Sequence, residues 1–217
     1  MKIDPHIHTN YSKDGISSIK DIVLEAKRKG MDAIAITDHN SIEGWPEAIR
    51  VSQELNFPII LGDEINSKQG DIIGLFLKEK IEGKKKEARF VMEEIKKQGG
   101  IVIIPHPFHG ALGFKGDVSE YLDLIDGIEV INGRRPFKQP DKVAYEFALK
   151  HNLAMTGGTD AHCYQAVGDA YTECDANNIE EFKQALLNKK TKAKGKKSNL
   201  IYALAPALAK LGFKKHN

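Results

Sequence analysis

Histidine and carboxylate side chains recur along this chain directly after short apolar runs. His6 and His8 follow the first run, and Asp160 and His162 repeat the same i, i+2 spacing late in the chain. In an extended segment such a pair points to one side, so both residues can reach the same metal ion. Single residues of these types follow three further runs, namely His39, Glu64 and His106. Imidazole and carboxylate ligands together suit zinc, manganese or iron, whereas a purely oxygen set favours magnesium or calcium.

Apolar runs alternate with longer amphipathic stretches, and this pattern predicts alternating strands and helices. We expect strands at Lys2–Asp4, Ala33–Thr37, Ile59–Leu61, Ile72–Leu77, Ile101–Ile104, Gly127–Ile131 and Ala154–Thr156. We expect helices at Ile19–Lys29, Trp45–Leu55, Lys84–Gln98, Ser119–Leu124, Lys142–His151 and Ile179–Asn188. Only the third and fourth strands lack a helix between them. Alternation of this kind favours a parallel sheet, and seven strands indicate an α/β barrel, with an open doubly wound sheet as the alternative.

The positions of the chemical groups relative to these strands suggest that they meet. In a parallel barrel the carboxyl ends of all strands open on one face, where the loops build the active site. A shared carboxylate such as Glu64 could bridge two ions about 3.5–4 Å apart. Asp38, which precedes His39, could cap a turn or orient the imidazole. Three other histidines are expected to be ordinary surface or core residues: His109, His151 and His216.

Six segments resemble the motifs of the PHP (polymerase and histidinol phosphatase) superfamily and occur in the same order. They are Pro5-His6-Ile7-His8-Thr9, Ser12-Lys13-Asp14-Gly15, Ile36-Thr37-Asp38-His39-Asn40, Gly62-Asp63-Glu64, Pro105-His106-Pro107 and Thr159-Asp160-Ala161-His162. The resemblance runs from about residue 1 to about residue 190. It implies a distorted, TIM-like barrel of seven β/α units with two or three divalent metal ions at its C-terminal face.

The resemblance also implies how the ligands are shared among the ions. The first ion would be held by His6, His8, Glu64 and Asp160. Glu64 would bridge to a second ion, which His106 would also bind. The third ion would be held by Asp14, His39 and His162. Without the resemblance, the segment around Asp14 reads equally well as a simple turn.

One position departs from the pattern that the resemblance implies. Many relatives carry a His at the start of the fourth strand, where this chain has Asp71. Asp71 could bind the second ion as a carboxylate, act through water, or leave that ion weakly bound. An Asp would also harden the ligand set and favour manganese over zinc.

The chemistry that such a centre implies is hydrolysis of a phosphate ester by a metal-activated water, without a protein nucleophile. Asp38 or His162 could relay a proton. Arg134 and Arg135 follow the sixth predicted strand and could bind phosphate through their guanidinium groups. The alternative is that they are two ordinary surface arginines, which the sequence does not distinguish. Lys115 is a weaker candidate for this role.

Three functions remain open at the level of sequence. A small phosphorylated metabolite or nucleotide is the favoured substrate. A nuclease acting on oligonucleotides or strand ends is the alternative, supported by the lysine cluster between Lys189 and Lys197 but without base-stacking aromatics nearby. A non-catalytic, metal-stabilised module that serves a partner protein is the third possibility.

Composition sets the remaining expectations. The chain has 217 residues and a formal net charge of +2, which is too small to imply a nucleic-acid partner by itself. We expect a barrel over residues 1–190 and a basic linker with a C-terminal helix over 191–217, the helix spanning Leu200–Leu211 and packed on the barrel. Cys163 and Cys174 read as reduced thiols, which makes a cytoplasmic location the default. The pattern predicts no signal peptide and no membrane association, and it leaves the oligomeric state open.

Overall fold

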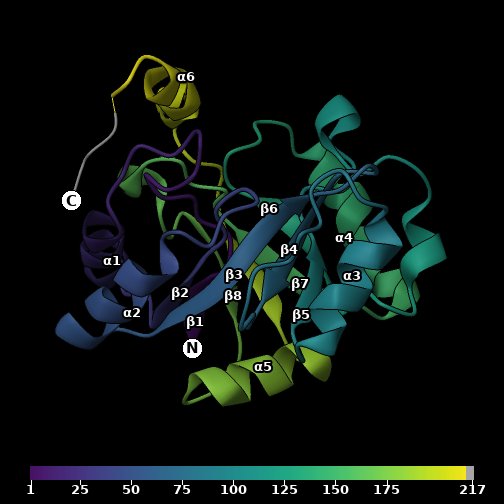
Figure 1. Cartoon of the computed structure of the whole chain (residues 1–217). Coiled ribbons are helices and arrows are strands. Elements are labelled where there is room, and N and C mark those ends of the chain that lie inside the picture. The colour runs from purple at the N-terminus through teal and green to yellow at the C-terminus, as the bar shows by residue number, and fades with distance from the viewer. Residues whose placement is uncertain (214–217) are drawn as a thin grey trace.

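One mixed sheet of nine strands curls into a nearly closed barrel (Figure 1). The computed structural model describes residues 1–213. In chain order the strands are β1 (Lys2–Asp4), β2 (Ala33–Ile36), β3 (Ile59–Asn66), β4 (Asp71–Leu75), β5 (Ile101–Ile104), β6 (Gly127–Asn132), β7 (Ala154–Gly158), β8 (Ala170–Glu173) and β9 (Lys192–Gly195). They lie in the order β7-β6-β5-β4-β3-β2-β1-β8-β9. β4 runs antiparallel to β3 and β5, and β8 runs antiparallel to β1 and β9.

Side-chain hydrogen bonds connect β7, at one end of this strand order, with β8 and the start of β9 at the other end. The Thr172 hydroxyl in β8 donates to the carbonyl oxygen of Gly157 in β7 at 3.0 Å and accepts from the Gly157 amide at 3.1 Å. Thr191, just before β9, donates to the carbonyl oxygen of Met155 at 2.9 Å. Gly157 permits this approach, since a Cβ there would lie only 2.7 Å from the carbonyl oxygen of Tyr171. The barrel is therefore closed at this seam by hydroxyl groups.

Helices cover the outside of the barrel (Figure 1). Along its sides lie α1 (Ile19–Arg28), α2 (Trp45–Glu54), α3 (Ala88–Lys97) and α4 (Gln139–His151). Two further helices lie at opposite ends, α5 (Ile179–Leu187) and α6 (Ala205–Lys210). In α1 the Ser18 hydroxyl accepts a hydrogen bond from the Asp21 amide at 3.2 Å, which caps the first turn. The buried residues of α1 recur at helical spacing and form the stripe that faces the sheet: Ile19, Ile22, Val23 and Ala26.

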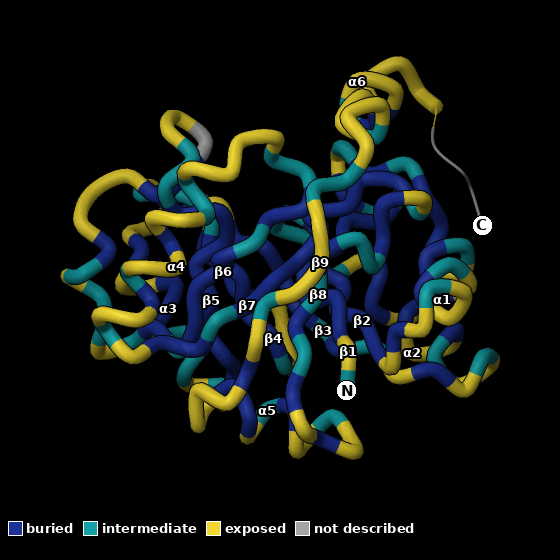
Figure 2. Tube along the Cα trace, turned by 180° about the vertical axis from the view of Figure 1, so that it is seen from behind, coloured by how far each residue is buried: buried dark blue, intermediate teal, exposed yellow. Residues whose placement is uncertain are grey.

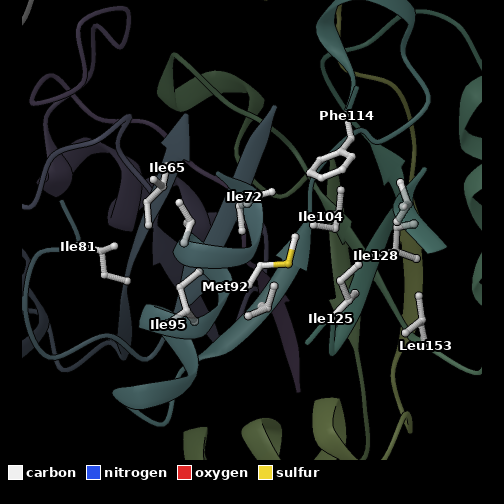
Figure 3. Packing of buried hydrophobic residues seen from close by; sticks show 14 of the residues in the cluster. Ile65, Ile72, Ile81, Met92, Ile95, Ile104, Phe114, Ile125, Ile128 and Leu153 are labelled. Carbon is white, nitrogen blue, oxygen red and sulfur yellow. The ribbon is translucent and has the colours of Figure 1, made fainter. Parts of the chain in front are cut away.

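Two apolar layers fill the space between the helices and the sheet. On one side Met92 and Ile95 of α3 pack in a cluster with Ile72, Ile104 and Ile128 of the sheet (Figure 3). On the other side α1 and α2 pack against β2. Figure 2 shows the result, because most of the strands are buried while the outer faces of the helices are exposed. These layers fix the strands and hence the residues that follow them.

A third apolar cluster fills one end of the barrel interior. It includes Ile3, Ile60, Ile73 and Ile103 from four different strands, and α5 adds Phe182. Each of these side chains is at most 3% exposed. Figure 1 shows α5 lying across this end, near the N-terminus. The opposite end, which we call the mouth, is where the polar residues gather.

The structure differs from the sequence prediction in the number and direction of the strands. All seven expected strands form, but β8 and β9 raise the total to nine within residues 1–213, so the expected number was too low. β9 comes from the lysine-rich stretch, where exposed Lys192 and Lys194 flank the half-buried Ala193. This strand was not predicted, because its exposed lysines leave no apolar run in the sequence. β4 is antiparallel because a tight turn, not a helix, connects it to β3.

The C-terminal segment is helical but only partly packed. Leu200–Leu204 is a 3₁₀ helix that continues into α6, where a single helix was expected. Ala205 and Ala209 are buried against the body. Four leucines of this segment are exposed: Leu200, Leu204, Leu208 and Leu211. The expected helix at Ser119–Leu124 is likewise a short 3₁₀ helix, Val118–Tyr121.

A few remaining sequence expectations concern single residues or the whole chain. Cys163 and Cys174 are buried free thiols. His216 lies outside the described residues, as do Lys214 and Lys215 at the end of the basic C-terminal segment. Among residues 1–213, the helices are all too short or too polar to cross a membrane.

Candidate metal centre

The structure brings all nine candidate ligands together at the mouth of the barrel. His6 and His8 follow β1, Asp14 lies in the loop before α1, and His39 follows β2. Later elements contribute the rest, namely Glu64 from β3, Asp71 from β4, His106 from after β5, and Asp160 and His162 from after β7. Glu64 lies inside its strand rather than after it, because β3 continues to Asn66. Asp71 reaches the same place from the beginning of a strand, since β4 is reversed.

Two of these ligands have an unusual backbone. His106 has a φ angle of +33° and Asp160 a φ angle of +53°, in the left-handed region that residues with side chains rarely adopt. Strain of this kind persists where the surroundings hold it, and it is concentrated at functional sites. Here it turns both side chains inward at the points where β5 and β7 end.

The side chains around His6 and His8 are spaced like the ligands of one cation. The two Nε2 atoms lie 3.2 Å apart, and they lie 3.4 and 3.1 Å from Glu64 Oε2. Asp160 Oδ1 lies 3.5 Å from His8 Nε2. Ligand atoms bound tetrahedrally at about 2.0–2.1 Å from zinc are themselves about 3.3 Å apart. The residues present therefore fit a metal ion at this position.

A second group of ligand atoms lies beside the first. Asp14 Oδ2 lies 3.3 Å from His162 Nε2 and 3.6 Å from His39 Nε2. The Ser12 hydroxyl donates to the other oxygen of Asp14 at 2.8 Å, so Asp14 is held in place rather than free in a turn. His8 closes the group, since its ring centroid lies 4.3 Å from that of His162. These four residues form one of the sets that could hold a metal ion.

The third possible position is more open. His106 Nε2 lies 3.3 Å from Glu64 Oε1. Asp71 shares a potential set with His39 and Glu64, but its Oδ1 accepts a hydrogen bond from Asn66 Nδ2 at 2.8 Å. One carboxylate oxygen of Asp71 is thus already engaged. The contacts leave the other oxygen as the candidate ligand.

Glu129, in the middle of β6, is a functional residue that the sequence analysis missed. Its Oε1 lies 3.0 Å from His6 Nδ1, and its Oε2 accepts from the His106 amide at 2.9 Å and from Asn132 Nδ2 at 2.8 Å. A carboxylate on the far nitrogen of a ligating imidazole fixes its orientation and raises its basicity. The available signal in the sequence was a single acidic residue among the apolar residues of this strand. In the folded protein Glu129 is only 3% exposed.

Two further buried carboxylates brace the segments that carry the ligands. Asp38 accepts from the Thr9 amide at 2.6 Å and from the Thr9 hydroxyl at 2.7 Å, so it anchors the segment after His8. Asp4 accepts from the Thr159 amide at 3.0 Å and from the His6 amide at 3.4 Å, and so ties the two ligand segments together. Burial raises the pKa of Asp4 and of Asp38 to about 6 in each case.

The ionisable groups of the mouth shift one another strongly. Burial alone would lower the pKa of His8, but hydrogen bonds to Asp160 and Glu64 raise it to about 9. Burial opposes ionisation of Glu64 and Asp160 as well, yet the neighbouring cationic groups hold both carboxyl pKa values well below their usual range. For His162, burial and the nearby His8 lower the pKa to about 4. Without a cation, this buried cluster balances its anionic carboxylates with protons on His6 and His8.

A cavity of about 280 Å³ opens onto these groups. Arg134 and Arg135 line it, and they approach Asp160 with N–O distances of 3.4 and 3.7 Å. Lys13 also lines the cavity, a cation that the sequence analysis did not single out. Lys115 is absent from the described lining residues. The cavity therefore combines possible metal ligands with cations suited to an anionic substrate.

The remaining described histidines lie outside the cluster. His109 Nε2 contacts Asp141 Oδ1 at 3.1 Å, and the His151 ring lies 4.3 Å from the ring of Phe147. Both are packed into the body of the protein, as expected for ordinary histidines.

The fold and the site together define a barrel protein whose buried cluster of His, Asp and Glu side chains could bind metal ions. The family model of the PHP domain matches residues 4–193. This chain therefore belongs to the PHP domain family, which confirms the resemblance seen in its motifs.

Comparisons with individual proteins agree with this assignment. MJ1587, an uncharacterized protein of Methanocaldococcus jannaschii, is 41% identical over 142 residues, which are 61% of this chain and 82% of that protein. A solved structure from Bacteroides vulgatus, a two-domain protein containing a predicted PHP-like metal-dependent phosphoesterase, has a TM-score of 0.78 at 24% identity. That match covers 90% of this chain and 65% of the two-domain chain. A shorter stretch of 66 residues is 42% identical to DNA polymerase III PolC-type of Halalkalibacterium halodurans and covers 30% of this chain but 5% of that polymerase.

Proposed function

We propose that this chain hydrolyses phosphate esters with two or three divalent metal ions held at the mouth of the barrel. The observation that carries the proposal is the position of the Glu64 carboxylate. Its oxygens lie within 3.4 Å of ring nitrogens of His6, His8, His39 and His106. A carboxylate at such a junction is suited to bridge ions. Membership in the PHP domain family and the likeness to PHP-like phosphoesterases support the same reading.

The proposed ligands divide into three sets that share members. The first ion takes His6, His8, Glu64 and Asp160. The third ion lies at the group around Asp14 and takes Asp14, His39 and His162. The second ion lies at the more open position and takes Glu64, His106 and the other oxygen of Asp71. It is the most weakly held, because one oxygen of Asp71 is already engaged by Asn66. Zinc, manganese and iron suit these sets, and the carboxylate at position 71 favours manganese at the second site.

The side chains have separate tasks in the proposed reaction. When bound, the ions supply a lowered pKa for water and positive charge for the phosphoryl oxygens. Arg134 and Arg135 donate hydrogen bonds to the phosphate and turn it toward the ligand cluster. Glu129 keeps the His6 ring fixed, while Asp4 and Asp38 hold the backbone segments on which the ligands lie. A protein nucleophile has no part in this scheme.

The size of the cavity favours a small substrate. The cavity volume of about 280 Å³ lies just below the usual range for small-molecule sites, which begins at about 300 Å³. The cations that line it select an anionic group, and the open side leaves room for a modest leaving group. We therefore propose a small phosphorylated metabolite or a nucleotide as substrate.

A hydrolysis screen tests the proposal directly. Purified protein would be supplied with zinc, manganese or iron and assayed on p-nitrophenyl phosphate, phosphorylated metabolites, nucleotides and oligonucleotides. We expect metal-dependent turnover that Asp160→Ala abolishes. The control Asp123→Ala, which removes an exposed carboxylate, should leave turnover intact. Absence of turnover with all three metals at neutral and alkaline pH would favour a non-catalytic, metal-stabilised module.

Arg134→Ala tests the substrate-binding role separately. The guanidinium of Arg134 lies at the cavity and 3.4 Å from Asp160 Oδ1. Its loss removes a charge-assisted contact with the phosphate, so we expect KM to rise by about tenfold or more. Steady-state kinetics on the best substrate from the screen measure this. Unchanged KM and kcat would remove Arg134 from the site.

A nuclease activity is the second candidate, because a groove adjoins the mouth. It has a volume of about 640 Å³, and its lining includes Lys196 and the aromatic rings of Tyr164 and Tyr202. Arg28 and Lys29 also line it, and they pair there with Glu25 and Asp169. Cations with aromatic rings are the combination that binds single strands. The similarity to a PolC-type polymerase points in the same direction. Oligonucleotide binding that weakens steeply with salt would favour this candidate, whereas a flat salt dependence would exclude it.

A further inference from the structure

The residues that follow β9 form part of the wall beside the mouth. The Lys196 amide donates to the Asp169 carbonyl at 2.7 Å, and the Ser198 amide donates to the Gly133 carbonyl at 2.8 Å. Between them, Lys197 Nζ donates to the Asn132 carbonyl at 2.9 Å. These residues come after position 193, where the match to the PHP domain ends. This chain therefore braces its mouth with a segment beyond the matched region.

Lys197 makes more than one such contact. Its ammonium group also pairs with Asp141 Oδ2 in the first turn of α4. The other oxygen of Asp141 lies 3.1 Å from His109 Nε2, in the loop after β5. The side chains of Lys197, Asp141 and His109 are only 16%, 14% and 6% exposed, so solvent and salt screen these contacts weakly. Lys197 thus connects three segments that surround the mouth.

The contact with Asn132 matters because this residue organises the next turn. Its Nδ2 donates to Glu129 Oε2 at 2.8 Å, and its Oδ1 accepts from the Arg135 amide at 2.9 Å. The turn from Asn132 to Arg135 carries both arginines of the cavity. A hydrogen bond to the Asn132 carbonyl therefore fixes the turn from outside, while Glu129 fixes it from inside.

We infer that Lys197 is a positioning residue for substrate binding. It holds the Asn132–Arg135 turn in the orientation in which Arg134 and Arg135 line the cavity. The inference rests on the proposed function for the binding of phosphate, but not for the ordering of the turn. The lysine-rich stretch then has a structural task at the site, beyond its contribution of β9 to the sheet.

The test compares Lys197→Met with Lys197→Arg in the full chain. Met keeps most of the apolar stem but lacks the charge and the donors, whereas Arg keeps both. Lys194→Met, an exposed lysine of β9, is the matched control. Hydrogen exchange of the backbone over residues 131–137 reports the turn, and kcat and KM for a phosphate ester report binding.

For Lys197→Met we expect faster exchange in the turn and a KM raised by about three- to tenfold, with kcat changed by less than about twofold. Lys197→Arg should recover most of both effects, and Lys194→Met should match the parent protein. Asp141→Asn, which weakens the partner of Lys197, should raise KM in the same direction. It provides a second route if Lys197→Met folds poorly.

Unchanged exchange over residues 131–137 in a folded Lys197→Met variant would overturn the inference. So would a uniform rise in exchange over the whole chain with an unchanged KM, because that pattern indicates a purely structural contact. If the parent protein hydrolyses no phosphate ester, the proposed function fails, and the exchange experiment still decides whether Lys197 orders the turn.

Discussion

Along β3, Ile60 belongs to the apolar cluster at the closed end of the barrel, whereas Glu64 belongs to the ligand cluster at the mouth. Along β4, Leu75 and Asp71 make the same pair in the opposite chain direction. Residues separated by an even number along a strand share a face, so one wall serves both purposes. At the closed end apolar burial is sufficient by itself. At the mouth the same degree of burial encloses charges, which are costly unless cations or protons compensate them.

The comparison predicts that Glu64→Gln removes function rather than folding. Glu64 is the carboxylate shared by the first and second proposed ion positions, its Oε2 also lies 3.1 Å from His39 Nδ1, and an amide cannot replace its charge. We expect kcat/KM to fall by about 10³-fold or more, which corresponds to about 4 kcal/mol. Metal content by elemental analysis should fall as well. The exposed Glu93→Gln is the control, and a Glu64→Gln protein with parental turnover would break the distinction between the two ends.

Phe182→Ala at the closed end should have the reverse effect. Phe182 is fully buried in the interior cluster, so its truncation should lower the free energy of unfolding by about 3–5 kcal/mol. Denaturant unfolding measures this loss, with Leu187→Ala on the exposed side of α5 as control. Activity per folded molecule and metal content should stay near parental values. Loss of metal at full folding would show that the closed end also shapes the mouth.

Glu129→Gln tests how much a residue that contacts the candidate ligands, without being one, contributes to metal affinity at the mouth. The change keeps the size of the side chain but replaces the carboxylate oxygen 3.0 Å from His6 Nδ1. Outer partners of this kind are typically worth about 10- to 100-fold in metal affinity. Competition with a chromophoric chelator would measure the affinity. If Glu129→Gln binds metal as tightly as the parent, Glu129 serves only to hold the backbone of His106.

The pH dependence of metal binding tests the mouth without any substitution. In the metal-free fold His8 has a pKa of about 9 and His6 also has a raised pKa, so both carry protons at neutral pH. A metal ion must displace these protons, so its affinity should rise with pH up to about 9, by about tenfold per unit for each proton released. Calorimetry in buffers of different ionisation enthalpy counts the protons. An affinity that falls with pH over this range would contradict the proposed ligands.

The sequence alone predicted the positions of the strands that carry the candidate ligands. Parallel strands buried on both faces consist of unbroken apolar runs, such as Ala33–Ile36. It also predicted the candidate ligands that meet in the structure, since the types and spacing of His6, His8, Asp160 and His162 are specific. Placing Asp14 required the resemblance to a family. A turn containing an Asp has many possible uses, and only the fold shows that Asp14 reaches His162.

Other features could not be predicted from the sequence, because they depend on contacts between residues far apart in the chain. β9 is exposed and lysine-rich, so its only sequence signal is a weak alternation, and its pairing with β8 supplies the rest. Glu129 is identified by its contacts with His6 and Asn132, which lie 123 and 3 positions away in the chain. The role of Lys197 likewise follows from contacts across 56 and 65 positions.

The turn between β3 and β4 gives the mouth a property of a different kind. Ser67 and Gly70 close this turn, with the Ser67 amide 2.9 Å from the Gly70 carbonyl oxygen, so Glu64 and Asp71 belong to one short hairpin. A substitution at Asp71 would therefore alter the proposed second ion position from within the hairpin, without a change in the segments that carry His6 and Asp160. The metal preference of that position would then depend on one residue of a short loop, without redesign of the rest of the barrel.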